Sequence, residues 1–101
     1  MDFKIVAISG CLSEHSVSSG LVRAALLHKN LHLNVEVADI SGFPLMNPDI
    51  IGEVGFPAEV AKVREMVSRA DGVIVSFPDH NSLISATMKN AYDWISIKWN
   101  D

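Results

Sequence analysis

Hydroxyl side chains are concentrated in residues 9–19, which read Ser-Gly-Cys-Leu-Ser-Glu-His-Ser-Val-Ser-Ser. The segment follows an apolar run and leads into a helical pattern. A helix start presents free N–H groups and the positive end of a dipole, so added hydroxyl donors suit a phosphate group. Gly10 permits close approach of the backbone, and His15 adds a titratable group. We therefore predict that residues 9–18, named loop 1, bind a phosphate.

Other interpretations of loop 1 were weighed against the phosphate. Ser16 or a neighbour can act as a helix N-cap, but a cap accounts for one serine and the segment has five. Loop 1 lacks the Gly-Lys-Ser/Thr of a P-loop and the Gly-x-Gly-x-x-Gly of a dinucleotide fold. Cys11 is either a reactive thiol or a small residue that fills a tight loop, and we favour the second role.

A second polar segment, residues 77–84 or loop 2, follows another apolar run and contains Pro-Asp-His-Asn-Ser. Apolar, β-branched runs predict strands at 3–9, 34–40 and 72–77, of which the first and third have the pattern of strands buried on both faces. Helical spacing predicts helices over 17–29, from Pro57 to Ala70, and from about Ile84 onward. Segment 41–56 is rich in glycine and proline, which favours a long connection.

The order β-α-β-α-β-α predicts an α/β three-layer sandwich with right-handed crossovers and a parallel sheet. With the first strand central, the partial strand order is 2-1-3. The topological switch then lies between strands one and three, where ligands bind beyond the carboxyl ends. Loops 1 and 2 leave those two strands, so we expect them to share one site.

Composition narrows the classes of partner. The chain has 101 residues, a formal net charge of −4 and one cysteine. An acidic chain without a basic cluster disfavours nucleic acid as a partner. A lone cysteine fits a reducing compartment, no apolar run reaches the length of a membrane span, and no signal peptide is recognisable. We expect a cytoplasmic protein with no membrane span.

The second loop and the residues after it resemble the NADPH-dependent FMN reductases and NAD(P)H:quinone oxidoreductases, which are flavodoxin-like. Their pattern has Gly-Ser-Leu-Arg-x-x-Ser-x-Asn in the first loop and Pro-Glu-Tyr-Asn, then Leu-Lys-Asn-Ala-x-Asp-Trp, in and after the second. Segment 44–49 (Pro-Leu-Met-Asn-Pro-Asp) with Phe56-Pro57 also resembles the family. The plant quinone reductases are the branch we expect to be nearest, because Ser85-Ala86 replaces Pro-Gly. The matching positions are Gly10, Leu12, Ser16, Pro78, Asn81, Lys89, Asn90, Ala91, Asp93 and Trp94.

The resemblance implies a flavin enzyme. FMN would bind with its phosphate at loop 1, NADPH or NADH would reduce the flavin, and a quinone-like acceptor would be reduced in turn. Because the cofactor carries the chemistry, no catalytic acid or base is expected, and no metal. A homo-oligomer is expected as well. The residues implied for cofactor binding are Gly10, Cys11, Leu12, Ser13, Ser16, Ser18, Pro78, Asp79, His80 and Asn81.

Two features of the third predicted helix have structural interpretations. Lys89 and Asp93 are spaced as a solvated i,i+4 ion pair, with a subunit interface as the other possibility. Trp94 and Trp99 are expected to be packing residues.

The sequence also departs from the family pattern. Ser13 replaces the arginine, Ser18 the asparagine, Cys11 the serine after glycine, Asp79 the glutamate and His80 the tyrosine. The arginine would have been the best partner of a phosphate, so we expect weaker FMN binding.

The family continues for roughly another half domain beyond the point where this sequence stops. We therefore expect a single domain over 1–101 that is incomplete at the C-terminus, truncated after the third strand and third helix. Its third strand would be an exposed apolar edge.

Three alternatives stay open. The first is that the chain is a flavin-poor remnant that acts as a non-enzymatic interaction module. The second is an electron-transfer flavodoxin, although flavodoxins carry a Thr/Gly-rich phosphate loop. His28 and His32 have the i,i+4 spacing of some zinc helices, but Asn30 and the helix end between them disfavour a metal site.

Overall fold

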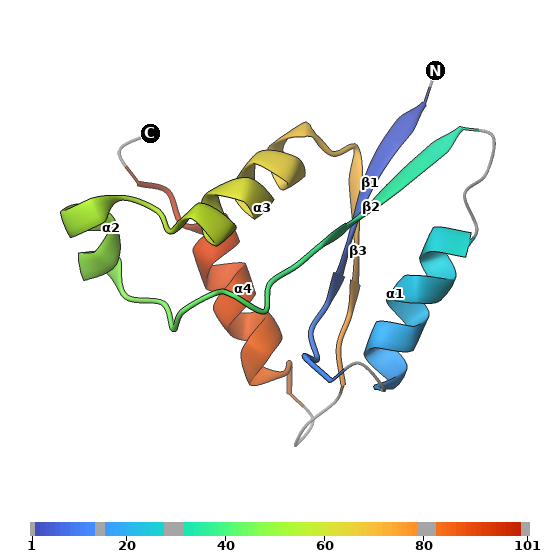
Figure 1. Cartoon of the computed structure of the whole chain (residues 1–101), viewed down its shortest axis with the longest axis horizontal. Helices are drawn as coiled ribbons and strands as arrows, with labels where there is room; N and C mark the ends of the chain where they lie inside the picture. The colour runs from blue at the N-terminus through green and yellow to red at the C-terminus, as the bar shows by residue number, and fades with distance from the viewer. Residues whose placement is uncertain (1, 14–15, 28–31, 79–82, 100–101) are drawn as a thin grey trace.

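The structure is a computed structural model that describes residues 2–13, 16–27, 32–78 and 83–99. The elements follow one another as two βα units, an additional helix, and a final strand and helix (Figure 1). Their bounds are β1 Phe3–Ser9, α1 Val17–Leu27, β2 Leu33–Ala38, α2 Pro48–Val54, α3 Ala58–Arg69, β3 Gly72–Ser76 and α4 Ala86–Ser96.

The three strands form a parallel sheet in the order β2-β1-β3, which confirms the predicted order. Ile5 of β1 pairs with Val35 of β2 on one side and with Gly72 of β3 on the other. Because β1 is hydrogen-bonded along both edges and covered on both faces, its sequence is almost continuously apolar.

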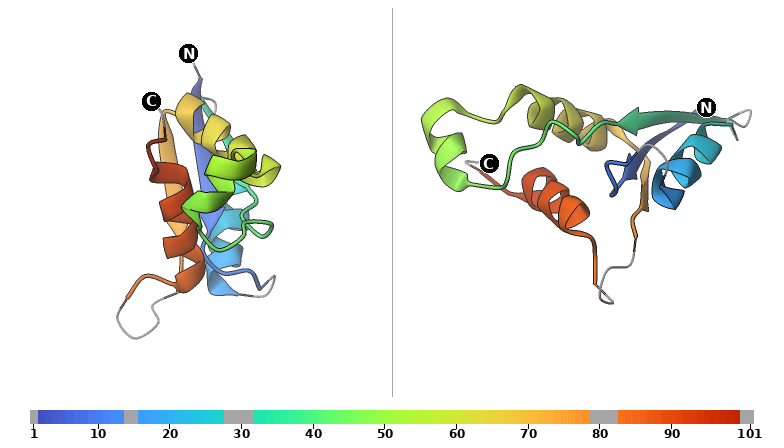
Figure 2. Two further views of the ribbon diagram at one scale, coloured as in Figure 1. Left: turned by 90° about the vertical axis from the view of Figure 1, so that its left-hand side faces the viewer. Right: turned by 60° about the horizontal axis from the view of Figure 1, so that its bottom comes forward.

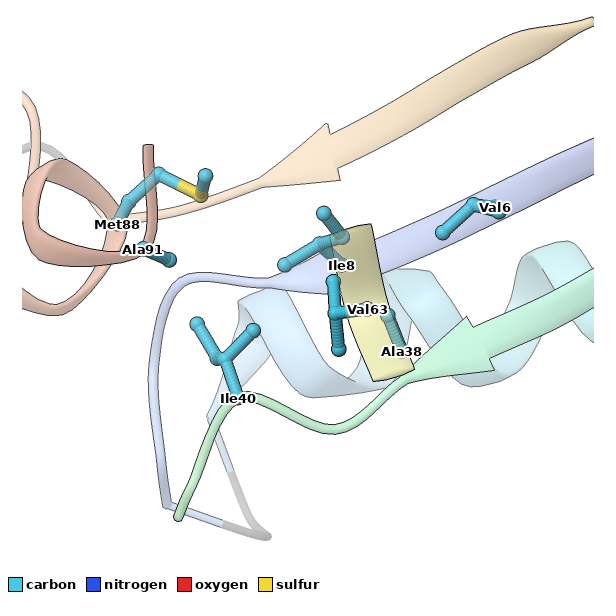
Figure 3. Packing of buried hydrophobic residues seen from close by; sticks show 7 residues of the cluster. All are labelled: Val6, Ile8, Ala38, Ile40, Val63, Met88 and Ala91. Atoms are coloured by element: carbon cyan, nitrogen blue, oxygen red, sulfur yellow. The ribbon is translucent and has the colours of Figure 1, made fainter. Parts of the chain in front are cut away.

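Side chains of β1 alternate between the two faces of the sheet. Ala7 packs with Val22 of α1 on one face. Val6 and Ile8 join a cluster with Val63 of α3 on the other face, together with residues of α4 (Figure 3). In Figure 1, α1 lies on one side of the strands and α3 and α4 on the other. The predicted three-layer sandwich is therefore confirmed.

The predicted long connection over 41–56 is wrong in part, because it contains helix α2. Asn47 is the N-cap, and its side chain accepts a hydrogen bond from the N–H of Asp49 at 3.0 Å. Pro48 follows at the first helical position, where its missing N–H costs nothing. Ile51 of α2 is buried with Val60 of α3 and Trp94 of α4. The described chain thus has four helices rather than the three that were predicted.

Two further boundaries differ from the prediction. Pro57 is the N-cap of α3 rather than its first residue. Among the described residues β3 pairs only with β1, so its outer edge is unpaired there and it is not a buried strand. Val73, Ile74 and Val75 are 40–44% exposed, which confirms the expected apolar edge. No helix in the described part of the chain has the length and apolar character needed to cross a membrane.

Candidate functional site

Loops 1 and 2 leave neighbouring strands at the same end of the sheet. β1 and β3 are parallel and adjacent, so their carboxyl ends lie together. The left-hand view of Figure 2 again shows the segments after β1 and β3 at one end of the molecule, beside the start of α1. Pro78 is half-buried at this end. The predicted cofactor-binding residues Asp79, His80 and Asn81 lie outside the described residues.

Serine hydroxyls bind one another around the start of α1. Ser16 is the N-cap: its Oγ accepts from the N–H of Ser19 at 3.0 Å and also donates to Ser19 Oγ at 3.0 Å. Ser19 Oγ in turn lies 3.1 Å from Ser9 Oγ, 3.2 Å from the Cys11 carbonyl oxygen and 2.9 Å from that of Ser13. The network fixes the path of loop 1 from strand to helix. Ser9 and Ser19, two of the five serines counted in the sequence, belong to this network although neither was among the predicted cofactor-binding residues.

The hydroxyl count that favoured a phosphate therefore needs correction. The cap interpretation holds for Ser16, and the hydroxyls of Ser9 and Ser19 are engaged within the loop. Ser18 is buried, 5% exposed. Ser13 is exposed, with its side chain open to solvent. The groups that loop 1 offers to a ligand are therefore the backbone N–H groups at the start of α1 and the Ser13 hydroxyl, rather than five hydroxyls.

Gly10 brings the two loops into contact. Its N–H donates to the Ser76 carbonyl at 2.6 Å, which extends the β1–β3 pairing by one residue. A Cβ at this position would lie 2.6 Å from Phe77 Cβ and 2.9 Å from Met88 Cβ. Only glycine fits so close a packing, because both neighbouring atoms are attached directly to backbone.

Ser85 joins loop 1 to α4, and no sequence pattern had singled it out for that role. Its hydroxyl donates to the Gly10 carbonyl at 2.8 Å and accepts from the N–H of Met88 at 3.2 Å. One buried hydroxyl thereby caps α4 and holds loop 1. The sequence signal available was a serine three residues before Met88, at the start of a helical pattern.

Residues of the Lys-Asn-Ala-x-Asp-Trp motif on α4 hold the chain before α2. Asn90 donates from Nδ2 to the Pro44 carbonyl at 2.9 Å and accepts from the Met46 N–H at 2.8 Å. Trp94 is fully buried, and its Nε1 donates to the same Pro44 carbonyl at 2.7 Å. We name residues 44–46 the latched segment. Asn90 and Trp94, which match the family motif, therefore hold the latched segment in place.

The remaining predictions for the last helix are confirmed. Lys89 Nζ and Asp93 Oδ1 form an i,i+4 ion pair at 2.5 Å, with both side chains partly exposed. Trp99 is half-buried in the cluster around Trp94. Arg64 adds a contact that was not predicted: it donates to carbonyls at the end of α4, including that of Trp94 at 2.8 Å, and lies over the Phe56 ring.

Two hollows adjoin loop 1. One, of about 190 Å³, lies between loop 1 and the chain that follows β2. The other, of about 220 Å³, is lined by Leu12, Leu45 of the latched segment, and Thr87 at the start of α4. A larger hollow of about 470 Å³ lies between β2 and α3, and its lining includes the carboxylates of Glu36, Asp39 and Glu59 together with Lys62. Among the described residues, Asp39 is the one carboxylate that lines the 190 Å³ hollow beside loop 1. Because carboxylates repel a phosphate, loop 1 remains the better candidate.

The carboxyl of Asp39, near these hollows, has a lowered pKa. The side-chain and backbone hydrogen bonds from Ser41 lower the pKa of its carboxyl below 3.8; Lys62 contributes in the same direction and partial burial opposes them. The Ser41 N–H donates to Asp39 Oδ1 at 2.9 Å. This arrangement stabilises the turn after β2.

Within the described ranges, no group of three or more His, Cys, Asp or Glu side chains is placed to hold a metal ion. His28 lies outside those ranges. His32 is exposed, and its Nδ1 is 4.0 Å from Asp2 Oδ1.

Comparison with known proteins gives concordant matches. The chain is 37% identical over 95 residues to an NAD(P)H-dependent FMN reductase of Pseudomonas aeruginosa, covering 94% of this chain and 51% of that protein. It is 38% identical over 96 residues to an NADPH:quinone oxidoreductase of Arabidopsis thaliana, with 92% and 49% covered. It is 33% identical to the quinone reductase of Escherichia coli, with 92% and 50% covered. The identity of this chain to the plant relative is close to its identity to the bacterial relatives, so these values do not single out the expected plant branch.

A solved structure shares the fold. The flavoenzyme FerB, an NAD(P)H:(acceptor) oxidoreductase from Paracoccus denitrificans, superposes with a TM-score of 0.84 at 21% identity, covering 96% of this chain and 52% of that one. The chain spans about half the length of the curated relatives it matches. The model of the NADPH-dependent FMN reductase family matches residues 3–101, and the chain belongs to that family.

Proposed function

We propose that this chain supplies the phosphate-binding half of an FMN site in an oxidoreductase that uses NADPH or NADH to reduce a quinone-like acceptor. The observation that carries the proposal is loop 1 at the topological switch point, tied to β3 and to the start of α4. The relatives named above as FMN and quinone reductases support the chemistry.

The residues of loop 1 fit a phosphate. The start of α1 offers the positive end of a helix dipole and first-turn N–H groups that have no intrahelical partner. Ser13 adds an exposed hydroxyl, and the network around Ser19 holds the loop in shape without any ligand contact. Loop 1 carries no Lys or Arg, so binding would depend on N–H and hydroxyl donors.

When bound, FMN would accept a hydride from the nicotinamide and pass electrons to the acceptor. The chain's own residues would bind and orient the cofactor. Ser13 and the N–H groups at the start of α1 would hold the phosphate, while Gly10, Cys11 and Leu12 would shape the approach of the backbone. Ser16 and Ser18 would contribute to cofactor binding from the start of α1.

Pro78, Asp79, His80 and Asn81 of loop 2 would lie along the ribityl chain and the flavin ring. These roles stay proposals that follow from the resemblance.

A homo-oligomer also belongs to the proposal. The open edge of β3 carries Val73, Ile74 and Val75, each more than a third exposed, and Phe77 just beyond it is 42% exposed. An apolar strand edge of this kind pairs with a further strand, from the same protein or from a second copy of it. The acidic net charge supports a partner other than nucleic acid, and the lone cysteine supports a cytoplasmic location.

No observation favours the alternative of a non-enzymatic interaction module over a reductase. The test is anaerobic titration of the flavin-loaded chain with NADPH and NADH. Loss of the flavin absorbance with a stoichiometric amount of nucleotide, and its return on adding a quinone, is the expected result. If the chain binds FMN but neither nucleotide reduces the bound flavin, the result would support the interaction module instead.

A further inference from the structure

We infer that Ser85 is a positioning residue that holds loop 1 in its phosphate-binding conformation by donating to the Gly10 carbonyl. The inference deepens the proposed function and rests on it for the identity of the ligand. Ser85 belongs to neither loop 1 nor loop 2, and it is assigned from its contacts alone.

The geometry gives Ser85 two roles at once. Its Oγ donates to the Gly10 carbonyl at 2.8 Å and accepts from the Met88 N–H at 3.2 Å, and the residue is 3% exposed. A hydroxyl has one proton to donate and lone pairs to accept, so both bonds can form together. The start of α4 is therefore linked to loop 1 through a single oxygen atom.

Both backbone polar groups of Gly10 are hydrogen-bonded. Its N–H is fixed by Ser76 and its carbonyl by Ser85, so the direction of the chain into Cys11 is set by two bonds. An alanine at position 85 would leave the Gly10 carbonyl and the Met88 N–H buried without their partner. A buried group without a partner costs more than the bond itself contributes, so loop 1 would move toward solvent.

Cys11, the one cysteine, reports on loop 1 directly. The experiment compares the rate of Cys11 alkylation by iodoacetamide in the parent chain, Ser85→Ala, Ser85→Thr and Asn47→Ala. Asn47 is the matched control, because it is also a helix N-cap, accepting a 3.0 Å hydrogen bond from the Asp49 N–H, but caps α2 rather than α4. All four chains are first checked for equal helix content by circular dichroism.

We expect Ser85→Ala to raise the alkylation rate about five- to tenfold, as loss of a buried hydrogen bond of ordinary strength would do. Ser85→Thr keeps the hydroxyl and should restore most of the protection. Asn47→Ala should stay within about twofold of the parent, since distant sites act independently. Equal rates in Ser85→Ala and the parent, or equal increases in Ser85→Ala and Asn47→Ala, would overturn the inference.

If Ser85→Ala does not fold, the parent chain provides the test in urea below its unfolding midpoint. Protection of the Cys11 thiol and of the Met88 amide hydrogen should then be lost together, because both depend on one hydroxyl. Loss of thiol protection at a clearly lower urea concentration, with the Met88 amide still protected, would contradict the shared role.

A second arm measures FMN and riboflavin binding by flavin fluorescence quenching. Ser85→Ala should weaken FMN by about tenfold and riboflavin by less than about twofold, because only the phosphate contacts depend on loop 1. A parent chain that binds no FMN would refute the proposed function, and the alkylation rates would still decide whether Ser85 positions loop 1.

Discussion

Helix α4 holds two segments of the chain in different ways. The latched segment forms three hydrogen bonds with α4: Asn90 donates one and accepts one, and Trp94 donates the third. The described residues of loop 1 are linked to the start of α4 by one hydrogen bond, which Ser85 donates to the Gly10 carbonyl. The difference shows that the family motif on α4 stabilises the fold. The candidate binding loop depends instead on fewer hydrogen bonds to α4 and on those among its own serines.

The two segments also differ in what surrounds them. Pro44 is held by Trp94, which is fully buried with Ile51 and Val60. Loop 1 has two neighbouring exposed residues, Leu12 and Ser13, whereas in the latched segment the exposed Leu45 lies between two half-buried residues. Segments with fewer buried contacts open at lower free energy than the core, so we expect loop 1 to open more readily than the latched segment.

The largest expected effect comes from removing the centre of the latched segment's support. Trp94→Ala removes a fully buried ring and the donor to Pro44, and should lower the free energy of unfolding by about 3–5 kcal/mol. Domains of this class have a total of about 5–15 kcal/mol. Urea unfolding followed by circular dichroism measures the loss. Trp99→Ala, at a half-buried position, is the control and should cost clearly less; equal losses would contradict the special role of Trp94.

The next effect concerns the base of loop 1. Gly10→Ala places a methyl group 2.6 Å from Phe77 Cβ, so backbone must move, at a cost of about 1–3 kcal/mol. Gly20→Ala is the matched control: it lies inside α1, and its nearest neighbour, Arg23 Nη2, is 3.7 Å away. That change should stabilise the chain by about 0.5–1 kcal/mol. Thermal or urea unfolding of both variants checks the opposite signs.

Ser13→Arg sharpens the comparison by strengthening the ligand contacts of loop 1 alone. Ser13 is exposed, and an arginine there can donate two charge-assisted hydrogen bonds to a phosphate. We expect FMN to bind about tenfold more tightly and riboflavin to be unchanged. The gain should shrink as salt rises. Fluorescence quenching at low and high salt measures it, and an unchanged FMN affinity would show that loop 1 does not face the phosphate.

The smallest effect lies in the turn that leads toward the latched segment. Because the folded-state pKa of Asp39 is lowered, its charge stabilises the fold above pH 3.8 and loses that contribution as pH falls through the lower folded-state value. Asp39→Asn keeps an acceptor for Ser41 but not the charge. It should therefore lose less stability than the parent between pH 7 and pH 3. An identical pH dependence in urea unfolding would rule out this role.

Much of the fold follows from sequence pattern. The apolar runs and the helical spacing predict a parallel sheet with right-handed crossovers, and taking the first strand as central gives the order 2-1-3 that the structure has. Helix α2 was missed because Gly52 and Gly55 suggested a loop. The Asn-Pro at its start was the stronger signal, since it supplies a cap and a first helical residue.

The candidate site was less predictable. The five hydroxyls of residues 9–19 were taken together as evidence for a phosphate, but those of Ser16 and Ser19 are hydrogen-bonded within this segment. Hydrogen bonds between a loop and a distant helix, such as Ser85 to Gly10, join residues 75 positions apart and leave no periodic signal. The hydrogen bond from Asn90 to the Pro44 carbonyl could not be predicted from the sequence for the same reason.

The most direct test of the central claim is the ratio of FMN to riboflavin affinity in the parent chain. The two flavins differ only in the phosphate, so the ratio isolates what loop 1 contributes. Titrations followed by flavin fluorescence at low salt measure both constants. If loop 1 holds the phosphate, FMN should bind at least about tenfold more tightly than riboflavin. Equal affinities would contradict the account.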